Sequence, residues 1–321
     1  MKDALDLDAV RSARRRIAPW VLRTPVLRLS PRPGLELFAK AESLQATGAF
    51  KLRGAFSLMT TLPRGCPGVV AHSSGNHAQA VARAARALGL RAVVVMPDDA
   101  PANKRARTAA DGAEIVTVGS DSDLRARRAA EIAAEQGLVP VPPLDHPLVA
   151  AGQGTSALEL LEEVDSLDAF YAPVSGGGLM AGSAVALHAL QPSLALVAVE
   201  PEDANDTALS LAAGERRKIP PPRTIADGLR VRTPGELTWP VLRQHLARVA
   251  LVSDEELLDA MAFALCELRL VLEPSGAAAL AAALREGSGR VGVLLSGGNA
   301  DPAHLAEAAR RAAASAYNPG R

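Results

Sequence analysis

Short apolar segments rich in β-branched residues alternate along the chain with longer segments whose apolar residues recur at helical spacing. The predicted strands are Leu35–Lys40, Gly68–Ala71, Arg91–Met96, Glu114–Val118, Asp168–Val174, Leu194–Val199, Arg248–Val252 and Val291–Leu295. Helical spacing is clearest in Gln79–Leu88, Leu124–Gln136 and Leu179–Leu190. This alternation is typical of an α/β fold in which helices cover both faces of a parallel sheet.

The stretch Val69–Gly112 follows this alternation with particular regularity and ends at an Asp111-Gly112 turn. It predicts a small α/β domain inserted in a larger one, with the proline-rich segment Pro140–Pro147 returning the chain. We therefore expect a small domain over residues 67–145 and a large domain built from residues 1–66 and 146–321.

Composition narrows the range of partners. Lys plus Arg and Asp plus Glu each number 35, so no charge excess favours nucleic acid or an anionic membrane surface. The charged segment Met1–Trp20 lacks the apolar centre of a signal peptide, and no apolar run is long enough to span a membrane. Cys66 and Cys266 have neither metal-site nor disulfide-framework spacing. We therefore expect a cytoplasmic protein with two reduced thiols and no nucleic-acid or membrane partner.

Three glycine-containing segments carry the candidate chemistry, each at a transition from strand to helix. In the first, Lys51 stands between Phe50 and Leu52. Burial among apolar groups lowers the pKa of a lysine and makes its amine a better nucleophile towards a carbonyl. On this segment alone, an ordinary solvated lysine remains the alternative.

The second segment, His72–His77, follows a predicted strand and combines small hydroxyls, an amide and backbone N–H groups at a helix start. Such groups form an anion site, although a serine N-cap before an ordinary helix is the alternative. His72 and His77 are five residues apart, a spacing that does not place both on one helix face, so we do not expect a metal there.

The third segment, Ser175–Gly182, contains three consecutive glycines. Glycines let the backbone approach a phosphate closely, and the helix N-terminus adds its dipole. Gly176, Gly178 and Ala181 also fit the dinucleotide fingerprint, with Glu200 at the end of the next strand. Taken alone, the segment predicts a nicotinamide cofactor about as well as a phosphate cup.

The combination of motifs separates these alternatives. The three segments are followed or accompanied, in order, by Ala151–Thr155, Glu200-Pro201, Thr224–Gly228, Glu273-Pro274 and Leu295–Asn299. The sequence here resembles the fold-type II pyridoxal-phosphate enzymes (the tryptophan synthase β-like fold), specifically the serine/threonine dehydratase and serine racemase group, from about Arg23 to Asp301. The resemblance implies two open, twisted parallel-sheet domains with the cofactor in the cleft between them.

The resemblance also implies roles for individual residues around the cofactor. Lys51 would be the Schiff-base lysine and the base that removes the Cα proton, with Phe50 and Gly228 on the two ring faces. Asn76 would bind the 3′ oxygen of the ring, and the neutral hydroxyl of Ser296 its nitrogen, which favours β-elimination. The backbone N–H groups expected to hold the phosphate are those of Ser175, Gly176, Gly177, Gly178 and Leu179.

The substrate carboxylate would bind to Ser73, Ser74, Asn76 and His77. Racemases of the group have a serine at the position of Ser74 that faces the opposite side of Cα, whereas many dehydratases have alanine. The sequence departs from the group at two places: Ser175 stands where glycine is usual, and Leu124 where mammalian-type racemases have a functional arginine. The second departure counts against efficient racemisation.

A divalent metal is a further implication of the resemblance. Glu200, the carbonyl of Ala204 and Asp206 match the ligand positions of metal-activated members. Hard oxygen ligands suit Mg²⁺ or Ca²⁺. A solvated acidic loop is the alternative.

We therefore expect a pyridoxal-phosphate-dependent L-threonine/L-serine dehydratase, an ammonia-lyase that releases a 2-oxo acid and ammonia, with a homodimer as the default assembly. A serine racemase or a 3-hydroxyaspartate dehydratase on the same scaffold are the alternatives. Two more remote alternatives are an NAD-dependent oxidoreductase and a cofactor-binding regulatory protein without activity. The joint presence of Lys51, Ser74 and Asn76 argues against the regulatory protein. The sequence does not rank serine, threonine and hydroxyaspartate as substrates.

Overall fold

The computed structural model describes residues 5–73, 75–100, 102–119 and 121–316. The strands are β1 (Val26–Arg32), β2 (Leu35–Lys40), β3 (Val69–His72), β4 (Ala92–Pro97), β5 (Glu114–Val118), β6 (Val139–Pro140), β7 (Ala169–Pro173), β8 (Ala195–Pro201), β9 (Arg248–Val252) and β10 (Gly289–Leu294). The α-helices are α1 (Leu7–Ile17), α2 (Lys51–Met59), α3 (Asn76–Leu88), α4 (Ala102–Ala110), α5 (Ser122–Gln136), α6 (Pro147–Glu163), α7 (Gly178–Leu190), α8 (Asp206–Ala213), α9 (Thr238–His245), α10 (Asp254–Phe263), α11 (Pro274–Glu286) and α12 (Pro302–Ala316).

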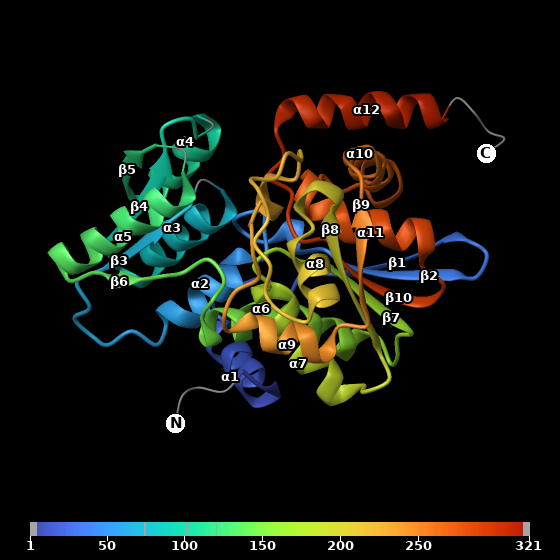
Figure 1. Ribbon diagram of the computed structural model, residues 1–321, viewed down its shortest axis with the longest axis horizontal. Coiled ribbons are helices and arrows are strands. Elements are labelled where there is room, and N and C mark those ends of the chain that lie inside the picture. The colour runs from blue at the N-terminus through green and yellow to red at the C-terminus, as the bar shows by residue number, and fades with distance from the viewer. Residues whose placement is uncertain (1–4, 74, 101, 120, 317–321) are drawn as a thin grey trace.

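Within the described residues the strands form two sheets (Figure 1). The larger has the order β1-β2-β10-β7-β8-β9 and the smaller β5-β4-β3-β6. Neighbouring strands are parallel except for the antiparallel pair β1–β2. The predicted α/β fold with parallel sheets is confirmed.

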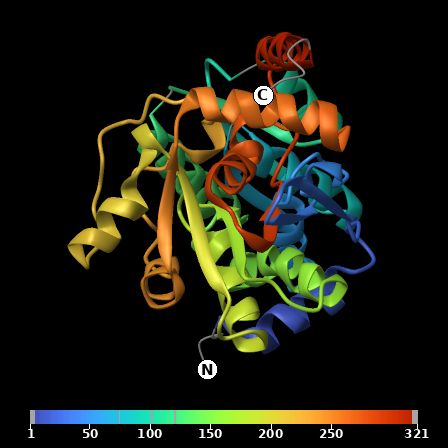
Figure 2. The same ribbon diagram turned by 90° about the vertical axis from the view of Figure 1, so that its right-hand side faces the viewer.

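Alternate residues of the larger sheet face two separate cores, because side chains in a strand point to opposite faces in turn. On β2, Leu37 and Ala39 pack with residues of α10 and α11, whereas Phe38 packs with α6 and α7. Figure 2, at right angles to the first view, shows this sheet running between its covering helices. Helices on both faces explain why its central strands are nearly continuous apolar runs.

The smaller sheet is covered in the same way. Val94 and Met96 of β4 pack in a core with α3, and Val93 and Val95 pack in a core with Ile132 of α5. The α3 core continues into α2, so α2 packs against the smaller sheet. The strands of the smaller sheet all lie between residues 69 and 140. The domain limits at 66/67 and 145/146 stay a prediction.

Every strand that the apolar pattern predicts is present, with ends shifted by at most two residues. The apolar pattern did not predict two further strands, β1 and β6. β1 is largely half-exposed and contains Pro31, and β6 has only two residues, so neither has a continuous apolar run. Both lie at an edge of their sheet, where fewer apolar contacts are needed.

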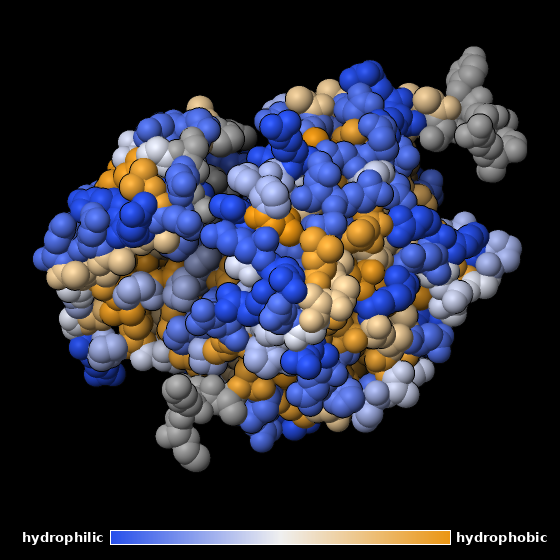
Figure 3. Space-filling model, in the orientation of Figure 1, coloured by the Kyte–Doolittle hydropathy of each residue, from blue (hydrophilic) through white to orange (hydrophobic). Residues whose placement is uncertain are grey.

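Charged and apolar side chains are mixed on the outer surface (Figure 3). The face in this view is hollowed between the lobe of the smaller sheet and the lobe that carries α12. In the described part of the chain, no helix has the length and apolar character needed to cross a bilayer. Both cysteines, Cys66 and Cys266, are free thiols.

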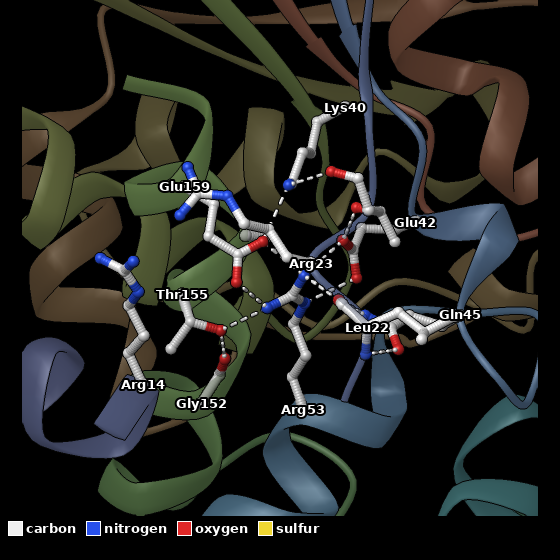
Figure 4. A network of polar contacts seen from close by, with 12 residues as sticks. Arg14, Leu22, Arg23, Lys40, Glu42, Gln45, Arg53, Gly152, Thr155 and Glu159 are labelled. Carbon is white, nitrogen blue, oxygen red and sulfur yellow. Dashed lines mark hydrogen bonds and ion pairs between the residues drawn. The ribbon is translucent and has the colours of Figure 1, made fainter. Parts of the chain in front are cut away.

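A buried ion network ties α2 to the larger sheet (Figure 4). Arg53 of α2 donates from Nε to Glu42 Oε2 at 2.7 Å and from Nη1 to Glu159 Oε1 of α6 at 2.8 Å. Lys40, at the end of β2, places Nζ 2.8 Å from Glu159 Oε2. The side chains of these four residues are at most 5% exposed. Burial alone would lower the pKa of Arg53, but Glu42 and then Glu159 outweigh burial and hold this pKa above its ordinary value.

We predict that Arg53→Met lowers the free energy of unfolding by about 3–5 kcal/mol, because it leaves buried carboxylates without their partner. The matched control is Arg91→Met, which removes an ion pair with Glu114 whose side chains are 45% and 53% exposed. That loss should cost only about 0–1 kcal/mol. Denaturant unfolding of both variants checks the difference, and equal midpoints would contradict it.

Candidate active site

Lys51 is the first residue of α2, so its position follows from the way α2 is anchored. The residue before it is fixed by Phe50 N, which donates to the carbonyl of Ser296 at 3.0 Å. Lys51 Nζ donates to the carbonyl of Pro143 at 2.8 Å and lies 5.2 Å from the centre of the Phe50 ring. Burial lowers the pKa of Lys51 to about 8. Near and above that pH the amine is neutral and can attack a carbonyl.

The glycine-rich segment lies against Leu144, the residue that follows Pro143. A Cβ atom on Gly176 would come within 2.3 Å of the Leu144 side chain, and Gly177 has a φ of +93°. The carbonyl of Gly176 accepts a hydrogen bond from Thr238 Oγ1 at 2.6 Å, which fixes the turn. A side chain at Gly176 would therefore have to displace Leu144, and one at Gly177 would be strained by the backbone conformation.

This glycine turn leads directly into the N-terminus of α7, at Gly178. The first backbone N–H groups of a helix have no partner inside the helix, and its dipole is positive at this end. Ser175 Oγ is buried and has no hydrogen-bond partner among the described residues. The turn is thus suited to an anion such as a phosphate group, and it shares the segment Pro143-Leu144 with Lys51.

Asn76 is the first residue of α3, and both ends of its side-chain amide are hydrogen-bonded. Its Nδ2 donates to Glu273 Oε1 at 2.5 Å, and its Oδ1 accepts from Asn299 Nδ2 at 2.8 Å. Glu273 N donates to the carbonyl of Gly297, next to Ser296. The structure therefore brings Asn76, Ser296 and the Lys51 segment into one set of hydrogen bonds.

Gly228 and Ser296 both contact Ser275, a residue that was not among the predicted site residues. Ser275 Oγ accepts from Gly228 N at 2.9 Å, and the carbonyl of Ser275 lies 3.5 Å from Ser296 Oγ. Ser275, Asn299 and Glu273 complete the site. Glu273 belongs to the Glu273-Pro274 motif and Asn299 to the Leu295–Asn299 motif, so the sequence contained a signal for both. Ser275 only follows the Glu273-Pro274 motif.

The residues predicted to bind the substrate carboxylate lie in the loop after β3 and at the start of α3. Ser73 Oγ accepts a hydrogen bond from Gly75 N at 3.2 Å, and His77 Nε2 pairs with the carbonyl of Val141 at 2.8 Å. Burial, with a smaller effect of the nearby Lys51, lowers the pKa of His77 to about 3, so its ring is neutral at physiological pH. Ser74 lies outside the described residues.

Glu200, near the end of β8, and Asp206, the first residue of α8, form a separate buried pair. Glu200 accepts from the backbone N–H groups of Thr207 and Ala208 at 2.9 and 3.0 Å. Both carboxylate oxygens of Asp206 are buried, with no hydrogen-bond partner among the described residues. Burial raises the pKa of Glu200 to about 7, and burial together with Glu200 raises that of Asp206 to about 8.

Two buried carboxylates whose pKa values are raised require a proton or a cation to compensate their charge. Ala204, which precedes Asp206 in the same turn, is also buried. The described residues hold no group of three or more His, Cys, Asp and Glu that could bind a metal ion, so a cation here would need carbonyl and water ligands as well. The unpartnered oxygens of Asp206 fit such an ion.

Comparisons with known proteins give a consistent result. The family described as "Pyridoxal-phosphate dependent enzyme" matches residues 17–297. The chain is 43% identical to L-threo-3-hydroxyaspartate ammonia-lyase of Saccharomyces cerevisiae over 301 residues, 91% of this chain and 92% of that protein. It is 42% identical to serine racemase of Oryza sativa subsp. indica, over 93% of this chain and 92% of that one.

Solved structures resemble this fold over nearly the whole chain. The crystal structure of the T.th. threonine deaminase superposes with a TM-score of 0.88 and 45% identity, over 92% of this chain and 99% of that one. These three proteins are named as an ammonia-lyase, a racemase and a deaminase. The resemblance inferred from the motifs is confirmed.

Proposed function

This chain belongs to the pyridoxal-phosphate-dependent enzymes of fold type II, and we propose that it is an ammonia-lyase for small hydroxy-amino acids, with L-threonine and L-serine as its substrates. The observation that carries the proposal is the amine of Lys51, whose pKa burial lowers to about 8, joined through the segment Pro143-Leu144 to a glycine turn suited to a phosphate. The identity of 45% to a threonine deaminase supports this choice of substrates.

The residues present fit pyridoxal phosphate. Its phosphate would be held by backbone N–H groups of the turn Ser175, Gly176, Gly177, Gly178 and Leu179, where added Cβ atoms at two of the glycines would clash. Phe50 and Gly228 would flank the ring, with Asn76 at its 3′ oxygen and Ser296 at its nitrogen. When bound, the cofactor supplies a carbonyl carbon that joins an amino group and a ring that withdraws electrons from Cα.

The chain's own groups then perform three tasks. Ser73, Ser74, His77 and the backbone N–H of Asn76 at the start of α3 hold the substrate carboxylate. Lys51 Nζ, neutral near and above pH 8, removes the proton from Cα. The neutral hydroxyl of Ser296 leaves the ring nitrogen unprotonated, which favours loss of the β-hydroxyl.

Lys51→Ala should abolish turnover while leaving the fold intact, because the variant loses both the covalent anchor and the base. The base alone accounts for a factor on the order of 10²–10⁴. The assay is 2-oxo acid release from L-threonine, L-serine and 3-hydroxyaspartate, with borohydride reduction to trap the cofactor on a peptide that contains Lys51. Lys218→Ala, in an exposed loop, is the control. A protein that binds NAD and not pyridoxal phosphate would refute the proposal.

Two other activities on the same scaffold are supported by the comparisons. An L-threo-3-hydroxyaspartate ammonia-lyase is 43% identical to this chain and a serine racemase 42%. Racemisation needs a proton donor on the face of Cα opposite Lys51, and Ser74 is our candidate for it. Leu124, 40% exposed on α5, takes the place of the racemases' arginine, so elimination should exceed racemisation.

Ser74→Ala should remove racemisation of L-serine and elimination from D-serine, because the second face loses its proton donor. Elimination from L-serine should survive, since Lys51 acts on the other face. Chiral chromatography of serine and a 2-oxo acid assay on the same samples measure both reactions. If racemisation persists in the variant, another group supplies the second proton.

We also propose that Glu200, the carbonyl of Ala204 and Asp206 bind Mg²⁺ or Ca²⁺. The support is the buried carboxylate pair and the unpartnered oxygens of Asp206. A cation between them would stabilise both ionised carboxylates and hold the turn between β8 and α8. The homodimer and the cytoplasmic location expected from the sequence stay predictions.

Chelation should lower the thermal unfolding temperature of the parent protein, and Mg²⁺ or Ca²⁺ should restore it. An ion at a hundredfold excess over its dissociation constant stabilises the folded state by about 2.7 kcal/mol. Asp206→Asn should lose this response, whereas Asp203→Asn, the same change at an exposed position of the same turn, should keep it. An Asp206→Asn protein that responds like its parent would contradict the site.

A further inference from the structure

Glu273 and Asn299 enclose the side-chain amide of Asn76 from two sides. Asn76 Nδ2 donates to Glu273 Oε1 at 2.5 Å, and Asn299 Nδ2 donates to Asn76 Oδ1 at 2.8 Å. Burial raises the pKa of Glu273 to about 7, and above that pH its carboxylate only accepts hydrogen bonds. The amide nitrogen of Asn299 only donates them, at any pH. The two neighbours therefore determine which end of the Asn76 amide is nitrogen and which is oxygen.

An asparagine NH₂ group carries two hydrogens. One is directed at Glu273, and the oxygen of the amide is occupied by Asn299. The second hydrogen remains for an acceptor on the cofactor. If the amide were reversed, its oxygen would face the ring oxygen of the cofactor, and two acceptors would meet.

Space for both neighbours is created by two glycines. A Cβ atom on Gly297 would lie 2.1 Å from Glu273 Oε1, and one on Gly48 would lie 2.6 Å from Asn299 Oδ1. Gly48 also has a φ of +74°. Real Cβ contacts are never so short, so any side chain at either position would displace a neighbour of Asn76.

Asn299 is held from two sides, by the loop before α2 and by helix α4. Asn299 Nδ2 also donates to the carbonyl of Thr47 at 2.7 Å, and Asn299 Oδ1 accepts from Arg107 Nη1 of α4 at 2.7 Å. One turn earlier on α4, Lys104 forms an ion pair with Asp227, the neighbour of Gly228. Helix α4 of the smaller-sheet lobe is thus linked to Asn299, which holds Asn76, and to Asp227.

We propose that Glu273 and Asn299 are positioning residues that fix the Asn76 amide with its second Nδ2 hydrogen towards the ring oxygen of the cofactor, and that Arg107 joins this arrangement to α4. The proposal rests on the cofactor role of Asn76 under the proposed function. Glu273 is 3% exposed, and its Oε1 accepts the hydrogen bond from Asn76 Nδ2 away from solvent.

The test compares Glu273→Gln with Glu286→Gln, the same change at the far end of α11, where Glu286 pairs with Arg248 near the surface. A glutamine can present its NH₂ group or its oxygen to Asn76, so only Asn299 still fixes the orientation of the Asn76 amide. We expect Glu273→Gln to weaken pyridoxal phosphate binding about tenfold, the effect of one hydrogen bond. We also expect it to change the visible absorption spectrum of the bound cofactor, which reports on the ring oxygen. Glu286→Gln should match the parent in both.

A double-mutant cycle separates positioning from a direct effect of Glu273. Asn76→Ala alone should produce the same spectral change and loss of affinity, and Asn76→Ala with Glu273→Gln should add nothing further. Additive effects, or a Glu273→Gln protein with parental spectrum and affinity, would overturn the positioning role alone. A parent protein that does not bind pyridoxal phosphate would overturn the proposed function and this proposal together. Thermal unfolding of each variant confirms that the fold is retained.

Discussion

The buried pairing of Arg53 with Glu42 and Glu159 is the interaction on which the rest of the site depends. Lys40 provides a second cation, so two positive and two negative side chains compensate each other away from water. Removing charges from water is costly, and the cost is offset only when every partner is in place. Because these side chains come from β2, α2, α6 and the turn at Glu42, the network sets one position for α2 and thus for Lys51 at its start.

The buried carboxylates of Glu200 and Asp206 differ from the Arg53 network because no cationic side chain in the described part of the chain compensates them. Glu200 has backbone N–H partners, but the carboxylate oxygens of Asp206 have none among the described residues, and the pKa values of both groups are raised by burial. In the Arg53 network, by contrast, burial would raise the pKa of Glu159, but Arg53 and Lys40 outweigh it and lower this pKa. A compensated cluster holds a fold together, whereas an uncompensated one is suited to binding a proton or an ion.

Much of the site could be predicted from the chain because its signals are local. Lys51 lies between apolar residues, the glycines of Ser175–Gly182 are consecutive, and each segment follows an apolar strand. The roles of Glu273 and Asn299 could not be predicted in this way, since their bonds to Asn76 join residues 197 and 223 positions apart. The motifs that contain them were visible, but not the side chain that they enclose.

The sequence by itself determined the strand pattern, the α/β fold, the family and the order of the motifs. The strand pattern and the fold depend on alternation within short stretches, which is a property of neighbouring residues, and the family follows from the resemblance of the ordered motifs to known enzymes. Only the tertiary structure decided which ionisable groups are desolvated and which side chains meet. The lowered pKa of Lys51 and the raised pKa of Asp206 are caused by burial under elements distant in the chain. Desolvation is a sum over all surrounding atoms, and that sum exists only once the chain has folded.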